Sequence, residues 1–197
     1  MLVDGPYEKK ERVYASQGDL LENFVYQSHC LREGKIEIDE IEMGFVLVLS
    51  QACDLEQDWF ARYPNDNKEK NEDKFIQDIL ICPVFSAQKL REGTHLTELL
   101  NITRKRRNGD QWGAVKLNKN ERYHFLAQDK KLGIPELAID FKQFFTVGRD
   151  KFYQVYRQKY KASLKDLFRE HVSIRFAQFL SRIGLPEIKK EENEKVI

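Results

Sequence analysis

The sequence predicts an α+β protein, mainly β, folded as a small and strongly bent β-barrel with an inserted charged loop and C-terminal helices. Three observations lead to this prediction: several apolar runs of strand length, a charge-rich stretch between two of them, and an amphipathic pattern of helical period near the C-terminus. At 197 residues the chain suits one domain, which we place at residues 1–187, and residues 188–197 follow as a polar tail.

The first half of the chain predicts a succession of strands. "GDLLENFVYQSHCLR" and the alternating "GKIEIDEIEMG" suit partly exposed strands, whereas "FVLVLS" is unbroken and predicts a strand covered on both faces. "FIQDILICPVFS" predicts a further buried strand that stops or bends at Pro83. Between the last two strands, residues 56–74 combine turn formers with dense charge, which predicts a mobile surface insertion.

The second half mixes helices and strands. Residues 87–120 predict a second insertion, a short helix followed by a basic loop, after which "ERYHFLAQ" and "ELAIDFKQFFTV" predict strands and "GRDKFYQVYRQKYK" predicts a helix. Ser163 and Asp166 have the spacing of a capping box and predict the start of the last helix. Gly184 and Pro186 predict its end.

Composition excludes several classes of protein. Charged residues make up 33% of the chain with a formal net charge of +1, so bulk charge favours neither nucleic acid nor membrane, and any anion-binding surface must be local. No apolar run is long enough to cross a bilayer and the N-terminus lacks the layout of a signal peptide, which predicts a cytoplasmic protein. Three cysteines without CxxC spacing predict reduced thiols, and neither a metal nor a cofactor is expected.

Two groups of residues are candidates for catalysis. Arg122 and His124 lie two apart in a predicted strand and so share a face, where a base and a phosphate-neutralising cation could act together. The alternative is a polar barrel face with Tyr123 in the core. Cys53, Asp54 and His124 formally complete a thiol site, but Cys53 could equally be a small buried residue at a strand end while Asp54 closes the following turn. His95 is expected to be an exposed polar residue.

A basic cluster is the best nucleic-acid feature of the sequence. Arg104, Lys105, Arg106 and Arg107 can contact phosphates, and Trp112 just beyond them can stack a base. Single-stranded RNA is therefore a possible partner, and an ordinary solvated loop is the alternative.

The ordered segments "QGDLLENFVY", "FVLVLS", "ILICPVFS" and "ELAIDFKQFFTV", followed by a helix ending in "FLSRIGL", resemble the PemK/MazF toxin family. The resemblance covers about two-thirds of the chain and implies an SH3-like barrel with a C-terminal helix, a homodimer, cleavage of single-stranded RNA without metal, and an antitoxin partner. Active members carry an Arg-Pro pair where the second segment begins and a Thr in the third. Here Gly44 and Phe45 take the first places and Phe85 takes the Thr position, beside Ser86, which could still bind a phosphate.

These departures predict a divergent PemK/MazF-like module that binds RNA or a protein partner without efficient cleavage, in a toxin-antitoxin or phage-defence setting. Metal-free cleavage needs a base, an acid and a cation on the reacting phosphate, and the usual cation is missing. One alternative is an active endoribonuclease whose site has moved to Arg122, His124 and the basic loop. Another is an enzyme that depends on Cys53.

Overall fold

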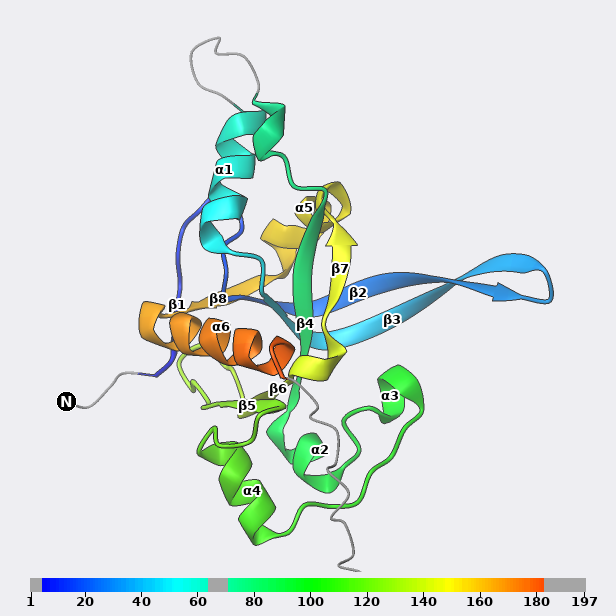
Figure 1. Ribbon diagram of the computed structural model, residues 1–197, viewed down its shortest axis with the longest axis vertical. Coiled ribbons are helices and arrows are strands. Elements are labelled where there is room, and N and C mark those ends of the chain that lie inside the picture. Colours follow the sequence, from blue (N-terminus) through cyan, green and yellow to red (C-terminus); the bar gives the residue numbers. More distant parts are fainter. Residues whose placement is uncertain (1–4, 64–70, 183–197) are drawn as a thin grey trace, which may run out of the picture.

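One antiparallel sheet, curled into a half-barrel, organises the computed structural model, which describes residues 5–63 and 71–182 (Figure 1). The strand order is β1-β8-β2-β3-β4-β6-β5, and β7 also pairs with β4. The α+β class is confirmed, although the sheet is a half-barrel and not a closed barrel. The strands are β1 Tyr7–Glu8, β2 Asp19–Arg32, β3 Lys35–Val48, β4 Asp78–Ser86, β5 Tyr123–Leu126, β6 Leu137–Asp140, β7 Phe145–Gly148 and β8 Tyr160–Leu164.

Helices cover both faces of the sheet. On β3, Leu47 belongs to a core cluster with Phe176 of the last helix, while its neighbours Val46 and Val48 belong to a second cluster with Phe152. The prediction that "FVLVLS" is covered on both sides is therefore confirmed. The helices are α1 Ala52–Arg62, α2 Ala87–Glu92, α3 Thr97–Leu100, α4 Gly109–Lys116, α5 Arg149–Lys159 and α6 Asp166–Leu180, with 3-10 turns at Glu72–Lys74 and Phe141–Gln143. Among the described residues, no helix has the length and apolarity needed to traverse a bilayer.

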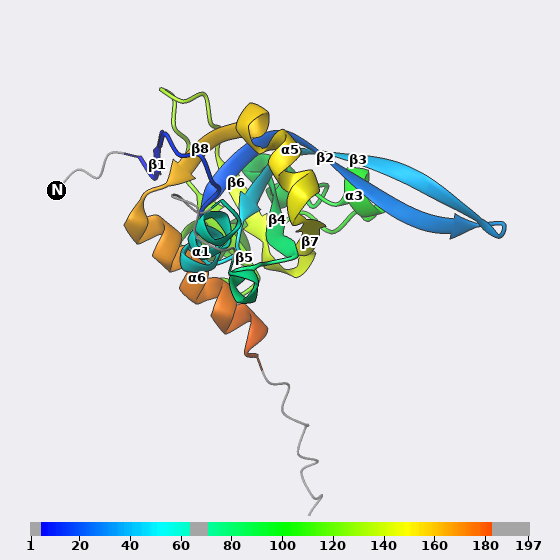
Figure 2. The same ribbon diagram turned by 90° about the horizontal axis from the view of Figure 1, so that it is seen from above.

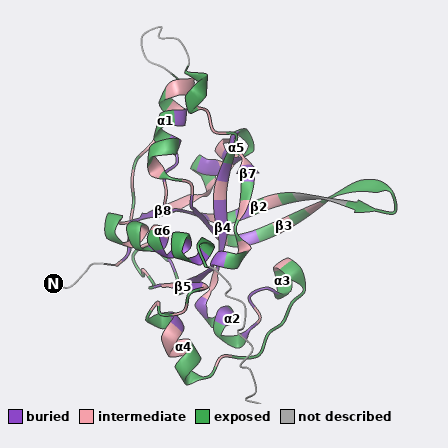
Figure 3. Cartoon of the chain, in the orientation of Figure 1, coloured by how far each residue is buried: buried purple, intermediate pink, exposed green. Residues whose placement is uncertain are grey.

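The outer parts of β2 and β3 leave the body of the protein as a two-stranded arm, residues 24–43 (Figures 1 and 2). Their register runs from Phe24 opposite Met43 to Arg32 opposite Lys35. At its base β2 pairs with β8 only over residues 19–21 and β3 pairs with β4 only over residues 45–48. The edges of the arm thus have no strand neighbour in the described part of the chain. Figure 3 shows β4 largely buried and the arm exposed toward its tip.

The expectation of a mobile surface insertion over residues 56–74 did not include the two helical elements that lie in its described parts. Residues 56–62 belong to α1, and residues 72–74 form a 3-10 turn; residues 64–70 lie outside the described residues. The helix is held by a buried carboxylate, Asp58, which accepts hydrogen bonds from Arg62 and from Arg149 of α5, each at 2.7 Å. Pro83 does not end β4 either, because the strand continues to Ser86 and Pro83 lies opposite Val46.

The predicted start of the last helix is also wrong. Ser163 lies in β8, which the sequence did not predict, and its hydroxyl donates to Asp19 at 2.6 Å. The helix begins at Asp166, and its N-cap residue Lys165 makes no capping hydrogen bond through its side chain. The amphipathic pattern expected near the C-terminus is confirmed: Phe168, Val172, Phe176 and Phe179 pack on the core, whereas Leu180 is exposed. The predicted stop at Gly184 and the tail over 188–197 lie outside the described residues.

Candidate functional site

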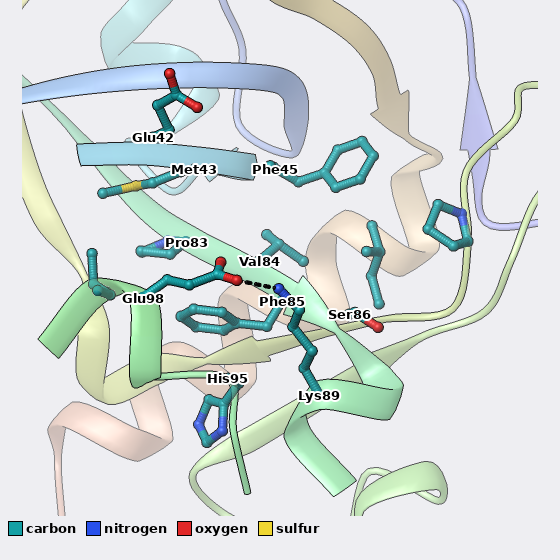
Figure 4. Close-up of a pocket in the computed structure, with 14 residues that line it drawn as sticks. Glu42, Met43, Phe45, Pro83, Val84, Phe85, Ser86, Lys89, His95 and Glu98 are labelled. Carbon is teal, nitrogen blue, oxygen red and sulfur yellow. Dashed lines mark hydrogen bonds and ion pairs between the residues drawn. The ribbon is translucent and has the colours of Figure 1, made fainter. Parts of the chain in front are cut away.

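The pairing of β3 with β4 forms one wall of a pocket. Phe45 lies opposite Val84, so residues 44–45 and 83–86 are side by side, and a cavity of about 220 Å³ opens against them. Residues of α2 and α3 line its other side (Figure 4). We call this cavity the β3–β4 pocket. It is lined by Glu42, Met43, Gly44, Phe45, Pro83, Val84, Phe85, Ser86, Lys89, His95, Glu98, Leu99, Pro135 and Leu137.

The polar groups of the β3–β4 pocket are mainly acidic. Lys89 of α2 is the one Lys or Arg among the described residues that line it, and its Nζ lies 2.6 Å from a carboxylate oxygen of Glu98 (Figure 4). Glu42 adds a second carboxylate. The remaining wall is largely apolar, so the pocket suits a flat ring such as a nucleobase better than a phosphate. A Cβ built on Gly44 would meet no atom within 4 Å, so a side chain fits there.

A buried ion pair lies beneath one wall of the pocket. Asp140, at the end of β6, accepts hydrogen bonds from Nε and Nη2 of Arg122 at 2.6 and 2.5 Å, and His95 Nε2 lies 3.4 Å from it. Burial alone would raise the pKa of Asp140, but the hydrogen bonds from Arg122 and His95 outweigh it and lower that pKa. His95 is buried, with its ring edge-on to Phe85, so the expectation of an exposed His95 is wrong. Arg122 is thereby occupied by an internal carboxylate.

His124 does not share a site with Arg122. It is buried, its ring lies beside those of Phe141 and His171, and no described interaction joins it to Arg122. Burial, followed by the positive charge of Arg175 and by His171, lowers the pKa of His124 to about 3. His124 is therefore neutral near pH 7. Tyr123 lies in a core cluster, as the alternative interpretation of this strand expected.

Cys53 and Asp54 occupy the exposed first turn of α1. The Cys53 thiol lies 3.5 Å from Oδ1 of Asp54 and 3.6 Å from Oε1 of Gln51, and the thiol is free. The interpretation of Cys53 as a buried residue at a strand end is wrong. Because the described contacts of Cys53 and those of His124 have no residue in common, the three-residue thiol set is not assembled.

The basic cluster is held in an ordered conformation between α3 and α4. The Arg104 backbone donates to Gly93 and the Arg107 backbone donates to Arg91, each at 2.9 Å. Gly93 has φ +85°, and a Cβ there would collide with the Arg104 carbonyl group. At the far end Asn108 caps α4 in a capping box with Gln111.

The four cations of this cluster divide into two kinds. Arg104, Lys105 and Arg106 are exposed, and no side-chain partner is described for them in the residues that the structure covers. Arg107 turns inward, where it donates to the Leu90 carbonyl and lies over the Tyr123 ring at 4.5 Å. We call residues 104–106 the basic segment. Trp112 is half-buried on α4, edge-on to Phe125, and is only partly available for stacking.

Sequence reasoning missed the acidic and buried members of this region. Glu42, Lys89 and Glu98 come together only through the β3–β4 register and the packing of the short helices. Asp140 did leave a signal, since a carboxylate directly after the apolar run "LAI" predicts a buried acid with a partner. No group of three or more potential metal ligands gathers within residues 5–63 and 71–182. Comparison of the chain with protein-family models, curated proteins and solved structures finds no significant match in any of the three.

Proposed function

We propose that this protein is a divergent PemK/MazF-like module with an SH3-like barrel, which binds single-stranded RNA and does not cleave it efficiently. The β3–β4 pocket would accept a base, and the basic segment would hold the phosphates. The toxin-antitoxin or phage-defence setting follows from the sequence resemblance alone.

The observation that carries this proposal is the composition of the β3–β4 pocket. Its wall is built from the two segments that resemble the catalytic landmarks of the family, and they are hydrogen-bonded neighbours here. The pocket has no free cation to stabilise a reacting phosphate. Gly44 and Phe85 bring no charge, and Lys89 is ion-paired with Glu98. A pentacoordinate phosphate in this pocket would meet carboxylates without a free cation, which disfavours cleavage.

The basic segment supplies the electrostatic part of the interaction. Its three cations point outward from a backbone that is already fixed at Gly93, so phosphates can bind without first ordering a loop. The backbone N–H of Arg104 is hydrogen-bonded to the carbonyl of Gly93 at the end of α2, and Lys89 of the same helix lines the pocket. A strand of RNA could therefore contact both surfaces.

The two enzymatic alternatives are less well supported. A relocated ribonuclease site would need Arg122 to leave Asp140 and His124 to become accessible and protonatable. A thiol enzyme would need a histidine near Cys53, and none is among its described contacts.

The test is fluorescence anisotropy of a labelled single-stranded RNA of about 15 nucleotides in EDTA, over a range of salt concentrations. Three phosphate contacts on a single strand predict a slope of about −2 in a plot of log affinity against log salt. The triple variant R104A/K105A/R106A should flatten this slope and weaken binding at low salt.

The matched control is K130A/K131A/K151A, which removes the same number of exposed positive charges elsewhere on the surface. The proposal is contradicted if the two triple variants weaken RNA binding equally, or if the unmodified protein does not bind RNA; a protein partner then becomes the better hypothesis. Fragments with 2′,3′-cyclic phosphate ends that appear in EDTA would instead favour the ribonuclease.

A further inference from the structure

One ion pair lies on the solvent side of the β3–β4 pocket. Lys89 extends from α2 and Glu98 from α3, and their charged groups meet beside Phe85, whereas the carboxylate of Glu42 points away from them (Figure 4). Nζ of Lys89 lies 2.6 Å from Oε1 of Glu98. Within residues 5–63 and 71–182, Oε2 of Glu98 has no hydrogen-bond partner, and Lys89 makes no other bond through its ammonium group. Both groups can therefore still bind a ligand.

Phe85 is held in place by buried neighbours. Its half-buried ring meets the ring of His95 edge-on, with centroids 5.1 Å apart, and His95 in turn lies 3.4 Å from the buried carboxylate of Asp140. An aromatic side chain that is fixed in this way offers a stacking surface to a flat ring. Every base has such a flat face, so stacking alone does not select among bases. Selectivity in this pocket must come from its polar groups.

The ion pair presents three hydrogen-bonding groups in a row. The Lys89 ammonium donates and the two carboxylate oxygens of Glu98 accept, in the order Nζ, Oε1, Oε2. The Watson–Crick edge of guanine has the complementary order, in which the acceptor O6 is followed by the donors N1–H and N2–H. Guanine can therefore form three hydrogen bonds with this pair, two of them to a single carboxylate.

The other bases match less of this pattern. Adenine and cytosine each carry one amino donor beside a ring-nitrogen acceptor, so each can form two of the three hydrogen bonds. Hypoxanthine, which is guanine without its 2-amino group, also forms two and leaves Oε2 of Glu98 without a partner. Uracil has O4 and N3–H in the right order, but its O2 atom then faces the negatively charged Oε2, which is repulsive.

We propose that the β3–β4 pocket selects guanine among the bases of single-stranded RNA, and that Lys89 and Glu98 determine this selectivity. The inference rests on the proposed RNA binding and adds the preferred base to it. The side chains are partly exposed, 49% for Lys89 and 78% for Glu98, so water competes for these hydrogen bonds. We expect guanine to bind about tenfold more tightly than uracil and about fivefold more tightly than hypoxanthine.

The first experiment is a titration of the full chain with the 5′-monophosphates of guanosine, inosine, adenosine, cytidine and uridine, followed through the chemical shifts of its backbone amides. These ligands share ribose and phosphate, so their affinities differ only through the base. The expected order is GMP first, then IMP, AMP and CMP together, and UMP last. Equal affinities for GMP and UMP, equal affinities for GMP and IMP, or no binding of any of them would overturn the proposal.

Variants separate the two members of the pair. Glu98→Gln keeps the size of the side chain but replaces one acceptor with an amide donor, so the affinity ratio of GMP to IMP should fall to about one. Lys89→Met should weaken both ligands equally and preserve their ratio, because both ligands carry O6. The matched control is Glu92→Gln, at an exposed residue of α2 whose carboxylate accepts from Gln88, and it should leave the ratio unchanged. A ratio that survives Glu98→Gln, or that falls equally in Glu92→Gln, would overturn the assignment.

Fluorescence anisotropy separates this inference from the proposed RNA binding. Two labelled RNAs of about 15 nucleotides should differ only at one central position, which is guanine in one and uracil in the other. Equal and salt-dependent binding of both would overturn guanine selection and leave RNA binding in place. If neither RNA binds while GMP is preferred over UMP, the RNA proposal fails and the base selectivity of the pocket stands.

Discussion

The burial of His124 predicts how the stability of the protein depends on pH. Its imidazole is buried beside Phe141, and burial together with Arg175 and His171 lowers its pKa from 6.5 to about 3. In the unfolded chain the same group binds a proton near pH 6.5. Between these two values the unfolded state binds more protons than the folded state. The stabilising effect of neutral His124 is therefore complete above pH 6.5 and is lost progressively as the pH falls toward 3.

The expected size follows from this difference. Each pH unit inside the window changes the free energy of unfolding by about 1.4 kcal/mol for one proton. Lowering the pH from 7.5 to 5 crosses about 1.5 units of the window, so His124 alone should reduce the free energy of unfolding by about 2 kcal/mol. Asp140 adds little to this pH dependence between pH 7.5 and 5, because the pKa of Asp140 is lowered from an already acidic value.

The assay is urea unfolding at pH 7.5 and pH 5, followed by circular dichroism, for the unmodified protein and for His124→Gln and His124→Phe. Both replacements are neutral at every pH. In each variant the difference in the free energy of unfolding between pH 7.5 and pH 5 should therefore be about 2 kcal/mol smaller than in the unmodified protein, however much the substitution lowers stability at pH 7.5. A pH dependence equal to that of the unmodified protein in both variants would refute the reasoning. It would also mean that His124 titrates near neutrality, which would favour the relocated ribonuclease.

Three further perturbations test other parts of the structure. Gly93→Ala should lower the free energy of unfolding by about 1–3 kcal/mol, because it puts a Cβ on a residue with left-handed backbone conformation and displaces the Arg104 carbonyl group. RNA affinity should fall as well. Gly113→Ala, where a Cβ meets no atom within 4 Å, is the control for both anisotropy and urea unfolding. Gly44→Arg should change the free energy of unfolding by less than about 0.5 kcal/mol and should strengthen RNA binding with a salt slope steeper by about 0.7; unchanged affinity would place the RNA outside the β3–β4 pocket. Asp140→Asn should lower the free energy of unfolding, measured in urea, by about 3–5 kcal/mol, because Arg122 loses its counter-charge. Asp150→Asn, at an exposed site, should lower it far less. Equal losses in the two variants would show that burial is not the cause.

The strands were predictable where the pattern of side chains reports burial directly. The run from Phe45 to Leu49 is apolar at every position because Leu47 faces α6 while Val46 and Val48 face α1 and α5. The arm was predictable as a strand for the opposite reason, since Ile36 and Ile38 alternate with charged residues. That it projects from the body was not predictable, because exposure of those isoleucines depends on where β4 stops pairing with β3.

Helix α1 was missed because a carboxylate anchors it. Only two residues of this helix, Leu55 and Asp58, are buried. An aspartate is normally expected on the surface, and the partner that allows Asp58 to be buried, Arg149, lies 91 positions later in the sequence. The same holds for Arg122 and His95, whose identities show neither burial nor pairing in isolation, whereas the burial of Asp140 is indicated by the apolar run before it. Ser163 was taken for a helix cap because its spacing fits one, whereas its hydroxyl serves Asp19 across the sheet. Patterns of hydropathy cannot identify such ion-paired and hydrogen-bonded positions, since the partner is fixed only by the tertiary fold.

Strand β3 serves three purposes along one unbroken run. Its first residues form the arm tip, residues 42–45 line the β3–β4 pocket, and Val46–Val48 lie in the core. Because side chains alternate with a period of two, adding one residue to each strand of the arm would exchange, beyond that point, the face that carries Ile36 and the face on which Arg32 pairs with Glu37. Natural variants of this protein with longer or shorter arms should therefore differ by even numbers of residues in each strand, so that arm length changes in steps of about 7 Å.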